Sequence, residues 1–344
     1  MYRSSSLRAL ALTLAALLVS AACGGAPGAP AAPAATVATA TAAPTVAAFK
    51  PAGPVEFVVH TAAGGGMDRA GRAWIDILQK DKLIEETWTV NNQSGGSGAK
   101  AMAYLFNQKG KTNVIAGMTT TWLATPLESS EVQNSYKDFT PVARMVTEKL
   151  VAAVRADSPY KDLNDFIAAA KAQPGKLNQT GGSVTAIEAL CKAVIEKETG
   201  AKWNYLSFPG GGERIAALLG GTAQIMFGDP AEFSEQVRGG RLRVIATIGQ
   251  ERSVLYKDAR TLAEHGLRAD VPTQTRGVLA PPGTAPGVVA YYAGVLKRLT
   301  ETAGWKTWVE QGDLQTAYIA GADFGKFLDA ENTKLAALIK EVKK

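Results

Sequence analysis

Cysteine and histidine are scarce in this chain of 344 residues, which contains only Cys23, Cys191, His60 and His265. Two cysteines cannot form a disulfide framework or supply a cysteine-rich zinc or iron–sulfur site. Two histidines likewise exclude a metal site built from clustered imidazoles. We therefore expect no metal and no cofactor, and we interpret Cys191 as a small buried apolar side chain.

Charge is also sparse, since charged residues make up 20% of the chain and the formal net charge is +6. The charges are spread along the sequence rather than gathered in blocks, so nucleic-acid binding is not indicated. Hydrophobic residues make up 46%, which is typical of a soluble globular protein. The length allows two domains of roughly 100–200 residues each.

Residues 1–22 are typical of a secretory signal peptide. Arg3 and Arg8 form its basic region, and residues 9–19 form an apolar run too short to remain in a bilayer. Three small residues then precede Cys23, an arrangement that resembles a bacterial lipobox. We expect Cys23 to become the lipid-bearing first residue of the mature protein. Plain cleavage before it is the alternative, because a serine stands where the lipobox prefers an aliphatic residue.

Residues 24–48 contain only Gly, Ala, Pro, Thr and Val. Such a stretch cannot bury enough apolar surface to offset the entropy lost on ordering it. We expect residues 23–50 to form a flexible tether that carries the lipid anchor, with the globular body beginning at Pro51. The tether would hold the body at the outer face of the cell membrane or in the periplasm.

From Pro51 onward, strand-like runs alternate with glycine-rich loops and helix-like segments. This alternation indicates α/β layers with mostly parallel sheets. Asp68 is a natural N-cap for the first helix. The expected strands are residues 55–59, 87–90, 112–118, 150–155, 177–180, 203–207 and 223–227, and the expected helices are residues 69–80, 99–108, 161–173, 185–198 and 213–219.

Four glycine-rich loops follow expected strands, at residues 64–68, 93–98, 181–183 and 209–212. In α/β sheets, ligands bind outside the carboxyl ends of the strands, where loops and helix N-termini present backbone N–H groups. Each loop taken alone could equally be a plain connecting turn. Four of them at one edge favour a shared cleft that receives an anion.

Nucleotide-binding and hydrolase motifs are absent from these loops. Arg69 stands where a dinucleotide fingerprint after Gly64 and Gly66 needs glycine, and no P-loop or nucleophile elbow occurs. For His60, at the end of the first strand, a packed structural role is favoured over ligand contact. Trp122 could stack on an aromatic acid or pack in the core.

Five segments together resemble the tripartite tricarboxylate transporter substrate-binding proteins, the TctC/Bug family. The first runs from Phe57 to Arg72 and contains the sequence HTAAGGGMDRAG. The others are Val90–Ala99, Tyr136–Val142, Leu206–Gly212 and Gly277–Pro286, the last of which resembles the family's Gly-Leu-x-Ala-Pro-x-Gly-Thr-Pro motif. The resemblance covers the chain from about Pro51 to its C-terminal end.

The resemblance implies an α/β fold with two lobes of the periplasmic-binding type, similar to type II. Each lobe would be a mixed sheet flanked by helices, with the ligand cleft between the lobes. The implied first lobe comprises residues 51–149 and 275–344, and the second comprises residues 150–274.

The resemblance also implies which residues hold the ligand. One ligand carboxylate would be held by backbone amides of the first loop and the helix after it, and further donors would come from the other loops, with Asp229 facing the cleft from the second lobe. The implied ligand-binding residues are Thr61, Ala62, Gly65, Gly66, Met67, Asp68, Gly96, Ser97, Thr119, Thr120, Thr180, Gly182, Ser183, Pro209, Gly210 and Asp229.

Two departures from the family pattern fall in the second lobe. The segment after Gly182 lacks the histidine that the family commonly carries there, and Phe208-Pro209 reverses the family's Pro-Tyr order. The distal half of the ligand site and the identity of the ligand therefore stay open.

These observations predict a non-catalytic, monomeric solute-binding lipoprotein. It would capture a small organic carboxylate and deliver it to integral-membrane transporter subunits. Two alternatives stay open: a sensor that presents its closed form to a membrane receptor, and an extracytoplasmic α/β enzyme, which the lack of a nucleophile–base pair disfavours.

Overall fold

A computed structural model describes residues 49–343 of the chain. The expected signal peptide, Cys23 and nearly all of the expected tether lie outside the described residues. The body begins slightly before the expected Pro51, because the Phe49 ring packs edge-on against Tyr291 with 5.5 Å between ring centroids. Within the described range, no helix combines the length and the apolar character needed to cross a bilayer.

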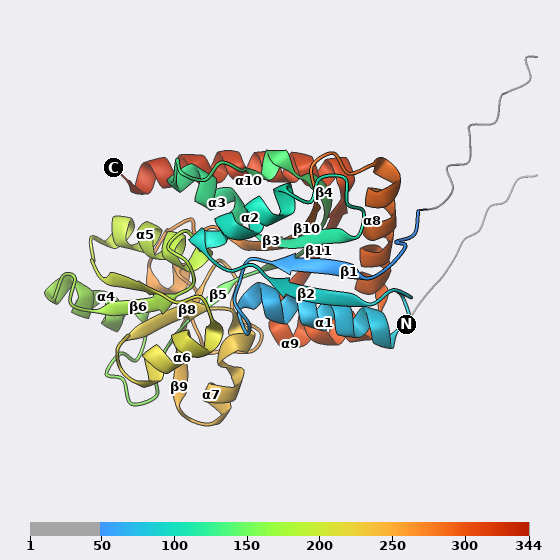
Figure 1. The fold of residues 1–344 in the computed structure, drawn as a ribbon. Helices are drawn as coiled ribbons and strands as arrows, with labels where there is room; N and C mark the ends of the chain where they lie inside the picture. The colour runs from blue at the N-terminus through green and yellow to red at the C-terminus, as the bar shows by residue number, and fades with distance from the viewer. Residues whose placement is uncertain (1–48, 344) are drawn as a thin grey trace, which may run out of the picture. The chain divides into compact units, whose positions relative to one another are not determined.

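The first sheet has six strands in the order β11-β4-β10-β3-β1-β2 (Figure 1). In this sheet β1 runs parallel to β2 and β3, whereas β10 and β11 pair antiparallel with β4. Its strands are β1 (Val55–Val59), β2 (Trp88–Asn92), β3 (Val114–Thr119), β4 (Thr140–Glu148), β10 (Gln274–Ala280) and β11 (Leu314–Ala320).

The second sheet has five strands in the order β7-β6-β8-β5-β9. Here β6 runs parallel to β7 and β8, and β5 pairs antiparallel with β8 and β9. Its strands are β5 (Leu150–Arg155), β6 (Asn178–Gly181), β7 (Asn204–Ser207), β8 (Ile225–Gly228) and β9 (Leu242–Ile248).

Both sheets are therefore mixed, and the expectation of mostly parallel sheets from the alternation alone is wrong. The chain passes from the first sheet to the second through Lys149 alone, between β4 and β5. It returns through residues 249–273, between β9 and β10. Strands that enter or leave a sheet at such crossings need not follow the parallel direction of βαβ units.

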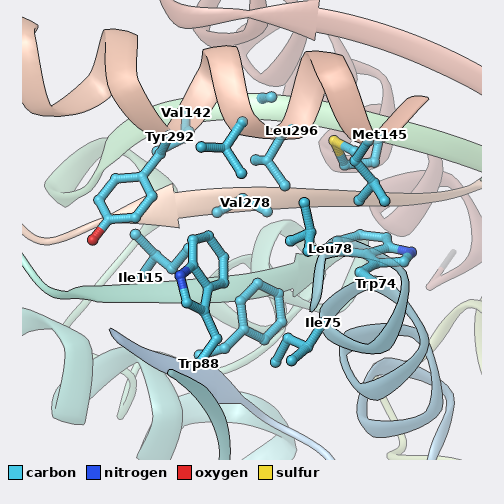
Figure 2. Close-up of a cluster of buried hydrophobic side chains, with 14 of the residues drawn as sticks. Trp74, Ile75, Leu78, Trp88, Ile115, Val142, Met145, Val278, Tyr292 and Leu296 are labelled. Carbon is cyan, nitrogen blue, oxygen red and sulfur yellow. The ribbon is translucent and has the colours of Figure 1, made fainter. Parts of the chain in front are cut away.

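Helices cover both faces of the first sheet. On one face α1 (Gly66–Lys80), α8 (Pro286–Glu301) and α9 (Ala303–Gly312) enclose an aromatic-rich core, which Figure 2 shows around Trp74, Trp88 and Tyr292. On the other face lie α2 (Ala99–Phe106), α3 (Thr121–Glu128) and α10 (Gly321–Val342). Burial of large aromatic side chains is the main stabilising contribution here.

The second sheet carries α4 (Leu163–Ala172) and α5 (Ile187–Thr199) on one face, and α6 (Gly211–Leu219) and α7 (Ser234–Arg238) on the other. Cys191 on α5 is fully buried, as expected, and burial raises the pKa of its thiol. The C-terminal helix α10 extends from the first sheet toward α5 (Figure 1), where Leu338 packs against the core of the second sheet.

The start of α1 differs from the expectation. Asp68 is not the N-cap, because Gly65 occupies that position and the helix begins at Gly66. The helix starts earlier because the Thr61 hydroxyl accepts a hydrogen bond from the Asp68 N–H at 3.1 Å, a role that a capping side chain usually fills. The Asp68 carboxylate lies in the first helical turn, where the helix dipole favours a negative charge.

Candidate functional site

A cavity of about 260 Å³ lies between the two sheets and is lined from both. Most of the expected site residues line it. His60 also lines it, although the sequence favoured a packed structural role for this residue. The expected residues in its wall are Thr61, Gly65, Gly66, Met67, Gly96, Ser97, Thr119, Gly182, Ser183, Pro209 and Asp229.

The remaining expected residues, Ala62, Asp68, Thr120, Thr180 and Gly210, do not line the cavity. Ala62 and Gly210 act through the backbone, since their carbonyls accept hydrogen bonds from Gly65 and Arg214. Thr120 lies behind the wall and joins two segments: its hydroxyl accepts from the Thr275 N–H and its own N–H donates to Gln274. Thr180 is fully buried within β6.

The N-terminus of α1 forms one wall of the cavity. The N–H groups of Gly66 and Met67 make no hydrogen bond to any described residue, and both residues line the cavity. Free N–H groups at the start of a long helix, together with the helix dipole, form a binding site for an anion. The geometry at Gly66 and Met67 therefore suits a carboxylate oxygen.

Asp68 holds this wall in place from behind. Its Oδ2 accepts the Gly64 N–H at 2.9 Å, and its Oδ1 accepts from Arg72 Nε at 2.9 Å and from Asn92 Nδ2 at 3.0 Å. Burial would raise the pKa of Asp68, but these hydrogen bonds outweigh it and lower the pKa. The carboxylate thus accepts from the loop, from α1 and from β2, and it leaves the helix N-terminus to a ligand.

A second glycine-rich loop, in the short 3₁₀ helix Gly96–Gly98, borders the same wall. Ser97 adopts a left-handed backbone conformation with φ of 52°, which is unusual for a residue other than glycine. The hydroxyl of Thr125 on α3 donates to the Ser97 carbonyl at 2.8 Å and helps to hold this conformation. Such strain is often found where a loop is shaped for a ligand.

Buried ionic side chains, which sequence reasoning missed, form much of the remaining wall. Arg276 on β10 hydrogen bonds through Nη2 to Glu148 on β4 and to Asp229 Oδ2, the latter at 2.8 Å. The Arg276 side chain is only 4% exposed. Arg276 and Glu148 are ionisable residues within strands that also contain apolar residues, but this signal does not identify their partners.

The pKa values of the two carboxyl groups that contact Arg276 shift in opposite directions. Burial raises the pKa of Glu148, and the nearby Asp229 raises it further, although Arg276 opposes both effects. Burial would also raise the pKa of Asp229, but the charges of Arg276 and Arg69 outweigh it, so this pKa falls. Asp229 is therefore the carboxylate of the pair that stays ionised.

A second buried group belongs to the second sheet. Arg214 on α6 donates through Nη1 to Glu188 Oε1 at 3.0 Å, and its Nη2 lies 2.9 Å from Glu232 Oε1. Burial is the largest influence on Glu188 and raises the pKa of its carboxyl group. Glu188 lies in the first turn of α5 and lines the cavity.

Further contacts join the walls across the cleft, in addition to the bond between Arg276 and Asp229. On α1, Arg69 Nη2 lies 3.2 Å from Asp229 Oδ2 and Arg69 Nη1 lies 3.7 Å from Glu232 Oε1. Arg69 therefore connects the first sheet and its helices to the second. The hydroxyls of Thr125 on α3 and Thr185 before α5 lie 2.6 Å apart. The structure thus holds the two walls in direct contact.

His60 lies in the cavity wall with its Nε2 at 3.1 Å from the Thr119 hydroxyl. Burial and the positive charge of Arg276 lower its pKa to about 4, so the imidazole is neutral at pH 7. Trp122 is fully buried and packs edge-on against Phe139 with 5.4 Å between ring centroids, so it belongs to the core rather than to the cavity.

Residues 78–343 match the protein family described as "Tripartite tricarboxylate transporter family receptor", or TctC. The chain belongs to this receptor family. The resemblance drawn from the five sequence segments is thereby confirmed. Within the described residues, no cluster of His, Cys, Asp and Glu has the arrangement of a metal site.

Curated relatives of this TctC family receptor cover most of its length. A UPF0065 protein in the gbd 5' region of Cupriavidus necator is 26% identical over 85% of this chain and 88% of its own length. Protein BugT of Bordetella pertussis is 27% identical over 72% of this chain and 76% of its own.

Solved structures agree with the fold. A TctC solute-binding protein from Polaromonas is 26% identical, with a TM-score of 0.61 over 85% of this chain and all of its own. The structure described as MatC from Rhodopseudomonas palustris with bound malate is 19% identical, with a TM-score of 0.76 over 84% of this chain and all of its own. The expected two-lobed periplasmic-binding-type α/β fold is confirmed, whereas the limits drawn for the two lobes stay a prediction.

Proposed function

We propose that this chain is an extracytoplasmic solute-binding lipoprotein that captures a small organic carboxylate between its two lobes. It then delivers the ligand to a tripartite tricarboxylate-type membrane transporter and catalyses no reaction. The observation that supports capture best is that Gly66 and Met67 line the cavity and that their N–H groups have no acceptor among the described residues. Lipid attachment at Cys23 and the transporter partnership rest on the sequence pattern and the family.

The proposed binding mode uses the α1 N-terminus as the seat of one ligand carboxylate. Oriented N–H dipoles in a site that excludes water bind an anion more strongly than they would in bulk solvent. Thr61 and Thr119 add side-chain hydroxyls to the wall, and the loop glycines let the ligand approach the backbone closely. This arrangement binds and orients a carboxylate.

The first test is a thermal-shift panel of mono-, di-, tri- and aromatic carboxylates, with amino-substituted carboxylates included, on the full-length chain. Malate belongs in the panel because a structural neighbour is described with bound malate, and adipate because a second neighbour is described with adipate. A ligand at about 100 times its dissociation constant should add roughly 2.7 kcal/mol of stability. Silence across the whole panel would reject carboxylate capture.

Gly66→Ala tests where the carboxylate sits. A Cβ at this position would lie 2.9 Å from Arg276 Nη2 and 3.1 Å from Asp229 Oδ2, so the helix N-terminus and its neighbours must shift. We expect the affinity for the best carboxylate of the panel to fall by at least about tenfold. Gly287→Ala in the first turn of α8 is the matched control, since a Cβ there meets nothing within 4 Å. Equal affinity in the two variants would move the carboxylate site elsewhere.

Lipidation and delivery need separate experiments. Labelled palmitate should be incorporated into the wild-type chain and not into Cys23→Ala. Cells that lack the protein should lose high-affinity uptake of the ligand, and the wild-type gene should restore it. Uptake that is unchanged by deletion would reject delivery to a transporter while leaving ligand capture intact.

A further inference from the structure

The cleft contains more carboxyl groups than arginines. The arginines Arg69, Arg214 and Arg276 are outnumbered by the carboxylates that they contact, which are Glu148, Glu188, Asp229 and Glu232. All four carboxylates are at most 14% exposed. Because burial raises the pKa of Glu148 and Asp229 is the ionised partner of Arg276, the charge that suits an occupant follows from the acceptors left unused rather than from this count.

The arginines are already largely committed to these carboxylates. Arg276 Nη2 serves both Glu148 and Asp229, and both Nη atoms of Arg214 are paired with Glu188 and Glu232. Arg276 Nη1, which lies beside Gly66, makes no hydrogen bond to a described residue. Arg276 Nη1 is therefore available to a ligand carboxylate, and it lies next to the free N–H groups of α1.

Unused acceptors face the same cavity from the second sheet. The cavity-lining carboxylates Glu188 and Asp229 each use one oxygen, Oε1 and Oδ2 respectively, in the bonds to arginine. The other oxygen of each, Glu188 Oε2 and Asp229 Oδ1, has no hydrogen-bond donor among the described residues. Ionised carboxylate oxygens accept and cannot donate, so they require an N–H or O–H group from the ligand.

We propose that the ligand is a zwitterion, with its carboxylate at the α1 N-terminus beside Arg276 and its protonated amino group between Glu188 and Asp229. This inference rests on the proposed function and names the class of carboxylate. An ammonium group offers three N–H donors to the unused acceptors and a positive charge to the ionised Asp229. A second carboxylate in the same place would face two carboxylates and meet like-charge repulsion.

The direction in which Glu188 titrates agrees with this assignment. Burial raises the pKa of its carboxyl group, and the charges of Asp229 and Glu232 raise it further, although Arg214 opposes them. A ligand ammonium beside Glu188 would stabilise the ionised form and reverse part of that shift. The carboxyl group is thus better matched to a cation than to a further anion.

Matched ligand pairs test the assignment with the wild-type full-length chain. In each pair an amino group replaces one carboxylate or is added to a monocarboxylate: β-alanine against succinate, 4-aminobutyrate against glutarate, and alanine against propionate. Isothermal titration calorimetry gives each affinity. We expect at least one amino member to bind about 100-fold more tightly than its partner, because attraction replaces repulsion in a buried site.

Two variants connect that preference to the named residues. Glu188→Gln and Asp229→Asn should each weaken binding of the preferred amino compound by at least about tenfold, and should change binding of its amine-free partner by less than about threefold. Glu235→Gln on α7 is the matched control, since its side chain is 81% exposed and outside the cavity. If either variant fails to fold, the comparison of ligand pairs with the wild-type chain still tests the assignment.

The outcomes separate this inference from the proposed function. Binding of an amine-free partner as tightly as its amino counterpart would overturn the zwitterion assignment and leave carboxylate capture in place. No binding by either member of any pair, together with silence across the wider carboxylate panel, would overturn both. A preference for the amino member that survives Glu188→Gln and Asp229→Asn would overturn the assigned position of the amine.

Discussion

Helices α1 and α5 both begin at the cavity and both carry an acidic residue in the first turn, yet they form walls of opposite character. On α1 the Asp68 carboxylate turns back to the Gly64 N–H and leaves the N–H groups of Gly66 and Met67 free. On α5 the Glu188 carboxylate lines the cavity itself. The orientation of one carboxylate thus decides whether a helix N-terminus receives an anion or is already supplied with one.

Arg276 lies where these two walls meet, so we expect its removal to have the largest effect on stability. Arg276→Met leaves the buried Glu148 without its arginine, and it leaves Asp229 with only the partly exposed Arg69 in contact. We expect the free energy of unfolding to fall by about 3–5 kcal/mol, as is usual when one partner of a buried ion pair is removed. Urea titration monitored by circular dichroism measures this loss.

Arg155→Met is the matched control for this prediction. Arg155 also binds a carboxylate, Asp157, but the two side chains are 40% and 69% exposed, so we expect no measurable loss of stability. Combining Arg276→Met with Glu148→Gln should recover part of the stability, because it removes one stranded charge. A loss below about 1 kcal/mol for Arg276→Met would contradict the buried ionic character of this wall.

The sequence identifies the first wall far better than the second. The glycine- and threonine-rich segments of this wall carry the family resemblance, and that resemblance led to Gly66, Met67 and Thr119, all of which line the cavity. The ionic residues give no comparable signal, because their chemistry depends on contacts between distant segments. Arg276 and Glu148, for example, are 128 residues apart in the chain.

The sequence predicts the fold, like the site, only in part. The period-2 and helical patterns located most of the elements before Asp229, and the strands Val55–Val59 and Leu150–Arg155 have the expected limits. Strand direction was not predictable from these patterns, because it depends on where the chain crosses between the sheets. The start of α1 was misplaced because Thr61, seven residues before Asp68, supplies the capping acceptor.

The protonation of His60 tests the first wall, and we expect its effect on stability to be of intermediate size. Its pKa in the folded protein is about 4, below its ordinary value of 6.5, because of burial and Arg276. As the pH falls below 6.5 the unfolded chain binds a proton that the folded chain refuses, so stability decreases until about pH 4. Between pH 7 and pH 5 this single group should cost about 2 kcal/mol.

His60→Gln isolates that contribution. The wild-type chain should lose about 2 kcal/mol more than His60→Gln between pH 7 and pH 5, because glutamine does not titrate. Denaturant titrations of both chains at the two pH values give the difference, and groups that titrate in both chains cancel. Parallel losses in the two chains would mean that His60 is reached by solvent and titrates normally.

Arg69 has the smallest expected effect, and it tests how the walls are held together. Its side chain is 39% exposed, so its contacts with Asp229 and Glu232 should contribute less than about 1 kcal/mol to stability. These contacts form only when the walls meet, so Arg69→Ala should act mainly on the closed form. We expect ligand dissociation to accelerate by about threefold with little change in association.

Stopped-flow dissociation of the best ligand at low and high salt checks this expectation. The effect of Arg69→Ala should shrink at 1 M salt, where the Debye length is about 3 Å and exposed ion pairs are screened. Lys80→Ala at the other end of α1 is the control, because its partner Asp76 lies on the same helix and does not connect the two walls.

The opposite result would be that Arg69→Ala slows association and leaves dissociation unchanged. Arg69 would then steer the ligand into an open cleft rather than hold the cleft closed, because steering by an exposed charge acts on the encounter rate. The two walls would then be held together by the buried contact between Arg276 and Asp229 and by the hydroxyl pair of Thr125 and Thr185.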